Sequence, residues 1–133
     1  MSTAFNEFFG WLWIGVGVAA GGVLGLRFHR DDWLGGYGSW ARRLVRLGHI
    51  AMIGLAGINI LFALSAPRVA LGEPWKQIAA WSLLLGAVLM PAGCFLAAWR
   101  KQLKGVLAVP AFLVSLGVTL VWIGLLRRAL GPL

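Results

Sequence analysis

Four side chains with soft or borderline donor atoms lie in two apolar runs of the sequence. His49 and Met52 are three residues apart in one run, and Met90 and Cys94 are four apart in the other. At these spacings each pair shares one face of a helix. With about 1.5 Å of rise per residue, Met52 and Cys94 each lie roughly 9 Å inside the basic end of their run. Imidazole, thioether and thiolate together suit Cu(I), so neighbouring helices would form a copper site.

The same residues allow two other interpretations. A haem b group between helices would use His49 and a methionine as axial ligands, and the remaining histidine, His29, lies in a polar connector. Methionine and cysteine in apolar runs are ordinary packing residues, and a lone histidine near a helix end commonly bonds to a carbonyl or to water. We favour this packing interpretation over metal or haem binding.

All four acidic residues lie at or outside the ends of the apolar runs: Glu7, Asp31, Asp32 and Glu73. A charged side chain inside the bilayer is costly and is retained where function needs it. The sequence therefore argues against a proton-coupled transporter, a voltage sensor and a carboxylate-based enzyme. The chain contains no CxxC, HExxH, GxGxxG or P-loop motif. We expect a non-catalytic protein rather than an enzyme.

The elements that carry these residues follow from composition. The 133 residues are 60% hydrophobic and 12% charged, with a mean hydropathy of +0.85. Soluble domains carry about a quarter charged residues, so a soluble globular enzyme is excluded. A hydrocarbon core about 30 Å thick needs about 20 apolar residues per helix. We predict one all-α integral membrane domain over residues 1–133, a bundle of four transmembrane helices running up-down-up-down with short connectors. The predicted spans are 8–26, 47–65, 75–99 and 105–126.

Helix ends are marked by local signals. Ser39 is a candidate N-cap, so the second helix should begin near Trp40, as an interfacial helical extension before its span. Pro74 suits the first turn of the third helix. Pro91 lies inside that helix, where it removes the hydrogen bond to the Ala87 carbonyl and is expected to cause a kink.

Basic residues are divided unequally between the two predicted membrane faces. The first and third connectors hold eight, and the other face holds four: Arg68, Lys76, Arg127 and Arg128. This bias predicts that both termini lie outside the cytoplasm, in a bacterial plasma (inner) membrane. The net charge of +8 thus indicates membrane topology rather than nucleic-acid binding. Six residues of the richer face are predicted headgroup anchors: Arg42, Arg43, Arg46, Arg100, Lys101 and Lys104.

Two stripes of small residues recur every four positions. The first span holds Gly17, Gly21 and Gly25, and the fourth holds Ala111, Ser115 and Thr119. Small residues allow close helix packing in lipid, so we expect these two stripes to pack against each other. Asn59, at the depth of Thr119, should hydrogen-bond across from the second span as structural glue.

These features favour a small non-catalytic subunit, or an assembly or stabilising partner, of a larger membrane complex of respiratory or photosynthetic type. The expected partners are the lipid bilayer and other membrane subunits or further copies of the chain. One alternative is a protein that binds Cu(I) or haem near the cytoplasmic side. The other is a small oligomeric channel or transporter, for which no solute is specified.

Overall fold

Four long helices account for most of the chain. The computed structural model describes residues 3–131, and this part contains helices and no strands. The long helices are α1 (Thr3–Phe28), α2 (Trp40–Ser65), α3 (Glu73–Trp99) and α4 (Ala108–Leu130), with the 3-10 helices η1 (Trp33–Gly35), η2 (Ala66–Arg68) and η3 (Lys101–Leu107) in the connectors. Four helical segments are long and apolar enough to cross a membrane, and they correspond to α1, α2 with η2, α3, and η3 with α4. The all-α class and the four apolar helices are therefore confirmed.

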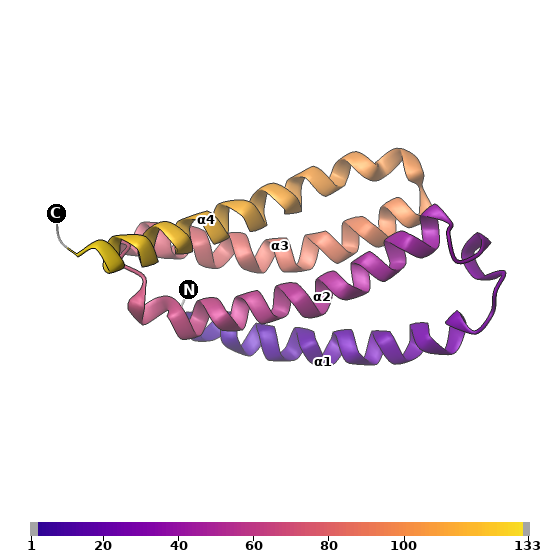
Figure 1. Cartoon of the computed structure of the whole chain (residues 1–133), viewed down its shortest axis with the longest axis horizontal. Helices are drawn as coiled ribbons and strands as arrows, with labels where there is room; N and C mark the ends of the chain where they lie inside the picture. The colour runs from indigo at the N-terminus through magenta and orange to yellow at the C-terminus, as the bar shows by residue number, and fades with distance from the viewer. Residues whose placement is uncertain (1–2, 132–133) are drawn as a thin grey trace.

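The four helices lie side by side along the long axis of the molecule, in the order of the chain (Figure 1). The α1–α2 and α3–α4 connectors lie at one end, and the α2–α3 connector lies at the other, where α1 begins and α4 ends. Extensive packing joins α1 to α2, α2 to α3, and α3 to α4, but not α1 to α4. We compared how many residues are buried in the most apolar stretch of each helix. The buried share is 56% for α3, against 17% for α1 and 17% for α4. Helix α3 is therefore the most buried of the four, and α1 and α4 are the outer helices of the bundle.

This order corrects the expected pairing of the two small-residue stripes. Gly17 and Gly21 of α1 face α2, where a Cβ would lie 2.9 Å from Ile53 and 2.5 Å from the His49 ring. Gly25 is exposed, with no neighbour within 4 Å of a Cβ position. On α4 the second stripe is exposed throughout: Ala111, Ser115 and Thr119. The stripes do not meet because each flanking helix packs on its neighbour in the chain.

The second helix begins at Trp40, as its cap predicts. The Ser39 side chain accepts a hydrogen bond from the Arg42 backbone N–H at 3.1 Å. The same hydroxyl donates to the carbonyl of Leu34 at 2.6 Å and closes the preceding turn. Leu34 and the following Gly35 have positive φ angles of 56° and 83°, so this connector uses the left-handed region to reverse direction.

The segment that contains the fourth predicted span begins as a 3-10 helix. Residues 101–107 form a 3-10 helix, and α-helix starts at Ala108 rather than at Gly105. Glycine is a poor helix former, and Pro110 has no N–H to donate to the Val106 carbonyl. The first regular turn therefore forms around Pro110, where a proline is tolerated.

The core lies where α2, α3 and α4 meet. Its buried residues are Phe62, Ala79, Ala80, Leu83 and Leu120. Glycines bring α3 and α4 close, because a Cβ at Gly117 would lie 2.7 Å from the Leu83 side chain and one at Gly86 would lie 2.5 Å from Val114. Close backbone approach of this kind is how apolar helices gain dispersion contacts.

Candidate functional site

A pair of buried asparagines joins α1, α2 and α3. Asn6 donates a hydrogen bond to the Asn59 side-chain oxygen at 2.8 Å and another to the Ala80 carbonyl at 3.0 Å. Asn59 donates to the carbonyls of Leu55 at 2.9 Å and Leu83 at 3.2 Å. Both asparagines are fully buried. Because an unpaired amide in an apolar interior costs on the order of 1 kcal/mol or more, these bonds fix the three helices relative to one another.

Asn6 was not predicted as part of this network. The first span was expected to begin at Phe8, whereas α1 begins at Thr3 and carries Asn6 inside the packed region. The available signal was an isolated amide flanked by Phe5, Phe8 and Phe9, which continue the apolar run. The hydrogen-bond partners of Asn59 lie on α1 and α3. Thr119 of α4, which was expected at the same depth, is exposed. Within residues 3–131 the Asn6 Oδ1 atom has no hydrogen-bond partner.

The carbonyl that Pro91 leaves without its helical donor is bonded by a tryptophan. Helix α3 continues through Pro91, which has no N–H to offer to Ala87. The Trp13 indole N–H of α1 donates to the Ala87 carbonyl at 3.1 Å. The predicted loss of a backbone bond is therefore compensated by a side chain from another helix, which joins α1 directly to α3.

A second tryptophan joins the first turn of α2 to the last turn of α3. The Trp40 indole N–H donates at 3.0 Å to the carbonyl of Ala97, in the last turn of α3 where carbonyls have no helical partner. The ammonium nitrogen of Lys101 lies 5.6 Å from the centroid of the Trp40 ring, within cation–π range. Trp40 therefore connects the start of α2 to both α3 and η3.

Arg42, in the first turn of α2, is predicted to be a headgroup anchor, but its side chain is buried against the α1–α2 connector. Only 4% of its surface is exposed. Its guanidinium donates at 2.7 Å to the carbonyl of Phe28, the last residue of α1, and also to the carbonyls of Arg30 and Asp31. A cation is favourable at the negative end of a helix dipole. The guanidinium carbon lies 5.2 to 6.0 Å from three ring centroids, those of Phe28, Trp33 and Tyr37.

The other predicted headgroup anchors are more accessible. Arg46 is half-buried, and its guanidinium carbon lies 4.3 Å from the centroid of the Tyr37 ring. The remaining four are exposed at the end of the molecule that holds the α1–α2 and α3–α4 connectors: Arg43, Arg100, Lys101 and Lys104. Their position on that end is compatible with contact to lipid phosphates, and their role as anchors stays a prediction.

Of the predicted soft-ligand residues, His49 and Met52 lie near α1, and Cys94 of α3 faces α2. The His49 Nε2 atom lies 3.0 Å from the Gly17 carbonyl oxygen, so the Nε2–H tautomer donates a hydrogen bond to α1. Met52 is buried and also packs near Gly17. Cys94 is buried on α3 against Gly48 of α2, and Met90 on the same helix is half-buried. No group of three or more His, Cys, Asp or Glu side chains in residues 3–131 is arranged to hold a metal ion.

Taken together, the site is a series of polar contacts between helices. Amide and indole donors from α1 and α2 bond to carbonyls of α3 at Ala80, Leu83, Ala87 and Ala97. Hydrogen bonds of this kind hold helices in register in an apolar surrounding. The chain matches no protein-family model, no curated protein and no solved structure.

Proposed function

We propose that the chain is an integral membrane protein that serves as a small non-catalytic subunit, or an assembly partner, of a larger membrane complex of respiratory or photosynthetic type. Its four apolar helices would cross the bilayer up-down-up-down. The internal polar contacts support this role, because they give the chain a defined shape that a partner recognises. The expected partner is another membrane subunit or a second copy.

The proposed location is a bacterial inner membrane with both termini outside the cytoplasm. This orientation is supported by the basic residues in the α1–α2 and α3–α4 connectors and in the adjoining turns of α1 and α2, which lie at one end (Figure 1). That end carries eight basic residues: Arg27, Arg30, Arg42, Arg43, Arg46, Arg100, Lys101 and Lys104. Cytoplasmic loops carry such an excess of arginine and lysine.

One face of α4 is the proposed contact surface for a partner helix. The residues that pack on α3 and its connector include Pro110, Gly117 and Gly124, and all three are buried. Ser115 and Gly117 are about 200° apart around the helix, so the small-residue stripe lies on the opposite side. The stripe, Ala111, Ser115 and Thr119, is exposed. Small side chains on an outward face let a further helix approach closely in lipid.

The test is native co-purification of variants. The chain is extracted from its own membranes in mild detergent, and the triple variant Ala111→Leu, Ser115→Leu, Thr119→Leu is compared with wild type. We expect the stripe variant to lose the partner, because leucine side chains keep a second helix at a distance. The control is Val109→Leu, which changes an exposed position of the same helix outside the stripe.

Two results would contradict the proposal. One is a stable wild-type monomer that co-purifies with no other polypeptide. The other is equal retention of the partner by the wild type and the stripe variant. Helicity and thermal unfolding of each variant in detergent show whether a loss of partner reflects the surface or the fold.

A further inference from the structure

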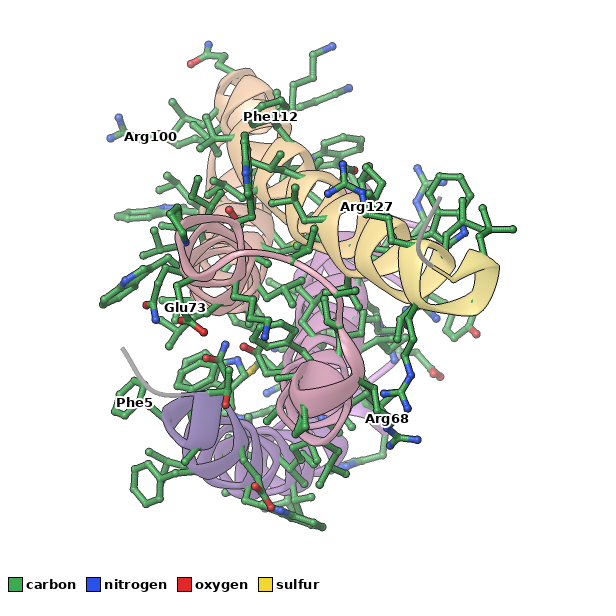
Figure 2. All side chains as sticks on the ribbon, turned by 90° about the vertical axis from the view of Figure 1, so that its left-hand side faces the viewer. Phe5, Arg68, Glu73, Arg100, Phe112 and Arg127 are labelled. Carbon is green, nitrogen blue, oxygen red and sulfur yellow. The ribbon has the colours of Figure 1, made fainter. Side chains whose placement is uncertain are left out.

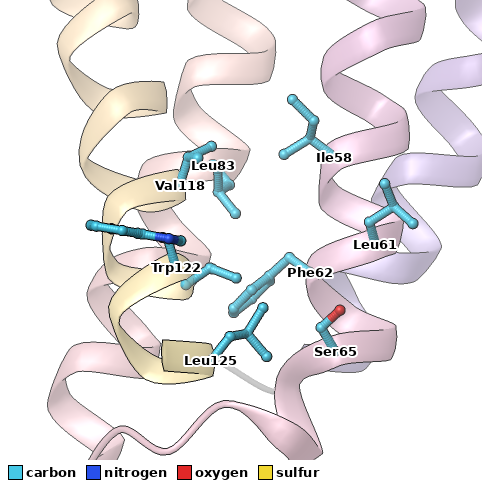
Figure 3. A pocket seen from close by; sticks show the side chains of 9 residues that line it. Ile58, Leu61, Phe62, Ser65, Leu83, Val118, Trp122 and Leu125 are labelled. Carbon is cyan, nitrogen blue, oxygen red and sulfur yellow. The ribbon is translucent and has the colours of Figure 1, made fainter. Parts of the chain in front are cut away.

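An apolar groove of about 340 Å³ lies between α2 and α4. These two helices both pack on α3 but share no extensive contact, so Leu83 of α3 forms the floor of the groove. Phe62 of α2 and Leu125 of α4 point towards each other across it (Figure 3). The remaining wall residues include Leu61, Ser65, Val118 and Trp122.

The shape of this α2–α4 groove suits a single extended hydrocarbon chain. From Val118 to Leu125 it runs along α4 for about 10 Å, at 1.5 Å of rise per residue. Its lining is almost wholly apolar side chains, and it is open on one side. Its lining residues on α2 and α4 lie in the second half of each helix, towards the end of the molecule at which α4 ends (Figure 1). In the proposed membrane orientation, the groove lies parallel to the acyl chains.

Each wall of the groove continues into an arginine towards that end of the molecule. Arg68 follows Ser65 by three residues, and Arg128 follows Leu125 by three, so each lies one turn beyond a lining residue. Both arginines are exposed. The ion pair found in residues 3–131 joins Arg30 to Asp32 at the other end, and within these residues no side-chain carboxylate forms an ion pair with Arg68 or Arg128.

Arg127 provides an internal comparison. It is adjacent to Arg128 and equally exposed, but lies about 100° away around α4. Viewed from the end where the termini lie, Arg127 lies on the side of α4 turned away from α2, and Arg68 projects beside the end of α2 (Figure 2). By sequence spacing, Arg68 and Arg128 each follow a wall of the groove by one turn, whereas Arg127 lies on another side of α4.

We infer that the α2–α4 groove binds an anionic phospholipid, with one acyl chain along Phe62 and Leu125 and the phosphate between Arg68 and Arg128. The apolar lining matches the acyl chain, and the two exposed guanidinium groups match the phosphate. A second copy of the chain or a partner's helix would fill the apolar groove but would not account for the two arginines one turn beyond its walls. The inference rests on the proposed membrane insertion and is independent of any partner complex.

Trp122 allows a direct test. The purified chain is inserted into phosphatidylcholine vesicles that contain a small fraction of a brominated lipid, either phosphatidylglycerol or phosphatidylcholine, and tryptophan quenching is measured. The quenching of Trp122 itself is obtained as the difference between the quenching of the wild type and that of Trp122→Phe. We expect about tenfold stronger apparent binding of brominated phosphatidylglycerol at Trp122, from two arginine contacts. The preference should vanish in Arg68→Gln with Arg128→Gln and persist in Arg127→Gln.

Equal quenching of Trp122 by the two brominated lipids would overturn the inference, as would an undiminished preference in the Arg68→Gln, Arg128→Gln double variant. Absence of Trp122 quenching by either lipid, in protein that floats with the vesicles, would mean that protein fills the groove, and this too overturns it. Protein that does not float with the vesicles contradicts membrane insertion itself and so the proposed function.

Discussion

The two halves of the molecule differ in their side-chain hydrogen bonds, although close packing at glycines occurs in both. On one side of α3, donors from α1 and α2 bond to its backbone carbonyls, and two buried asparagines meet between the three helices. On the other side, α4 packs on α3 through Gly86, Pro110 and Gly117 against apolar side chains. Directional bonds define the register of a helix, whereas glycine packing defines its distance. The polar half therefore specifies position, and the glycine half leaves the outer face of α4 free for other contacts.

The largest expected effect is on the glycine half. Gly117→Leu places a side chain where a Cβ already lies 2.7 Å from Leu83 and 3.3 Å from the Ala79 carbonyl. Overpacking of this kind costs about 3 kcal/mol of unfolding free energy. The measurement is unfolding in mixed micelles titrated with SDS. Gly25→Leu is the control, because nothing lies within 4 Å of its Cβ position, and an equal loss there would contradict the packing account.

A smaller effect is expected in the polar half. Asn59→Leu removes the bonds to Asn6, Leu55 and Leu83 and should lower the unfolding free energy by about 2 kcal/mol. Asn6→Leu should cost less, since it removes only the bonds to Asn59 and Ala80. Because both asparagines belong to one network, the double variant should lose less than the sum of the single losses. Strict additivity would mean that the two amides do not interact.

The bond between Trp13 and Ala87 is tested by a double-mutant cycle. Trp13→Phe keeps an aromatic ring but removes the indole N–H, at an expected cost of about 1 kcal/mol. In a Pro91→Ala background, residue 91 regains an N–H that bonds to the Ala87 carbonyl, so Trp13→Phe should then cost little. Equal cost in both backgrounds would show that Trp13 stabilises α1 by packing alone.

The smallest effect is expected on the outer face of α4. Thr119→Leu changes an exposed position and should alter the unfolding free energy of the isolated chain by less than about 0.5 kcal/mol. The same SDS titration measures it. A loss as large as that of Gly117→Leu would mean that this face packs within the chain, and the distinction between the two sides of α4 would fail.

The sequence was sufficient to predict what depends on local signals. Four apolar helices follow from composition, and the start of α2 follows from the Ser39 cap. The unpaired Ala87 carbonyl follows from Pro91, and the need of Asn59 for internal partners follows from its depth in an apolar run. Each of these consequences depends on one helix alone.

What was not predictable depends on how helices are arranged. Trp13 as donor to Ala87, and Asn6 as partner of Asn59, require knowing which faces of α1 and α3 meet. The burial of Arg42 depends on a connector that folds back through the positive φ of Leu34, whereas a basic residue among aromatics resembles a headgroup anchor. The pairing of α1 with α4 was predicted from similar stripes, but the order of helices across the molecule separates them.

We propose that the outer face of α4 receives another membrane helix. The most direct measurement is photo-crosslinking in intact membranes, with the photoreactive residue at Ser115 and, as a control, at the exposed Val109 of the same helix. We expect a crosslink from position 115 to another membrane polypeptide or to a second copy, and lipid adducts alone from position 109. Lipid adducts alone from both positions would contradict it.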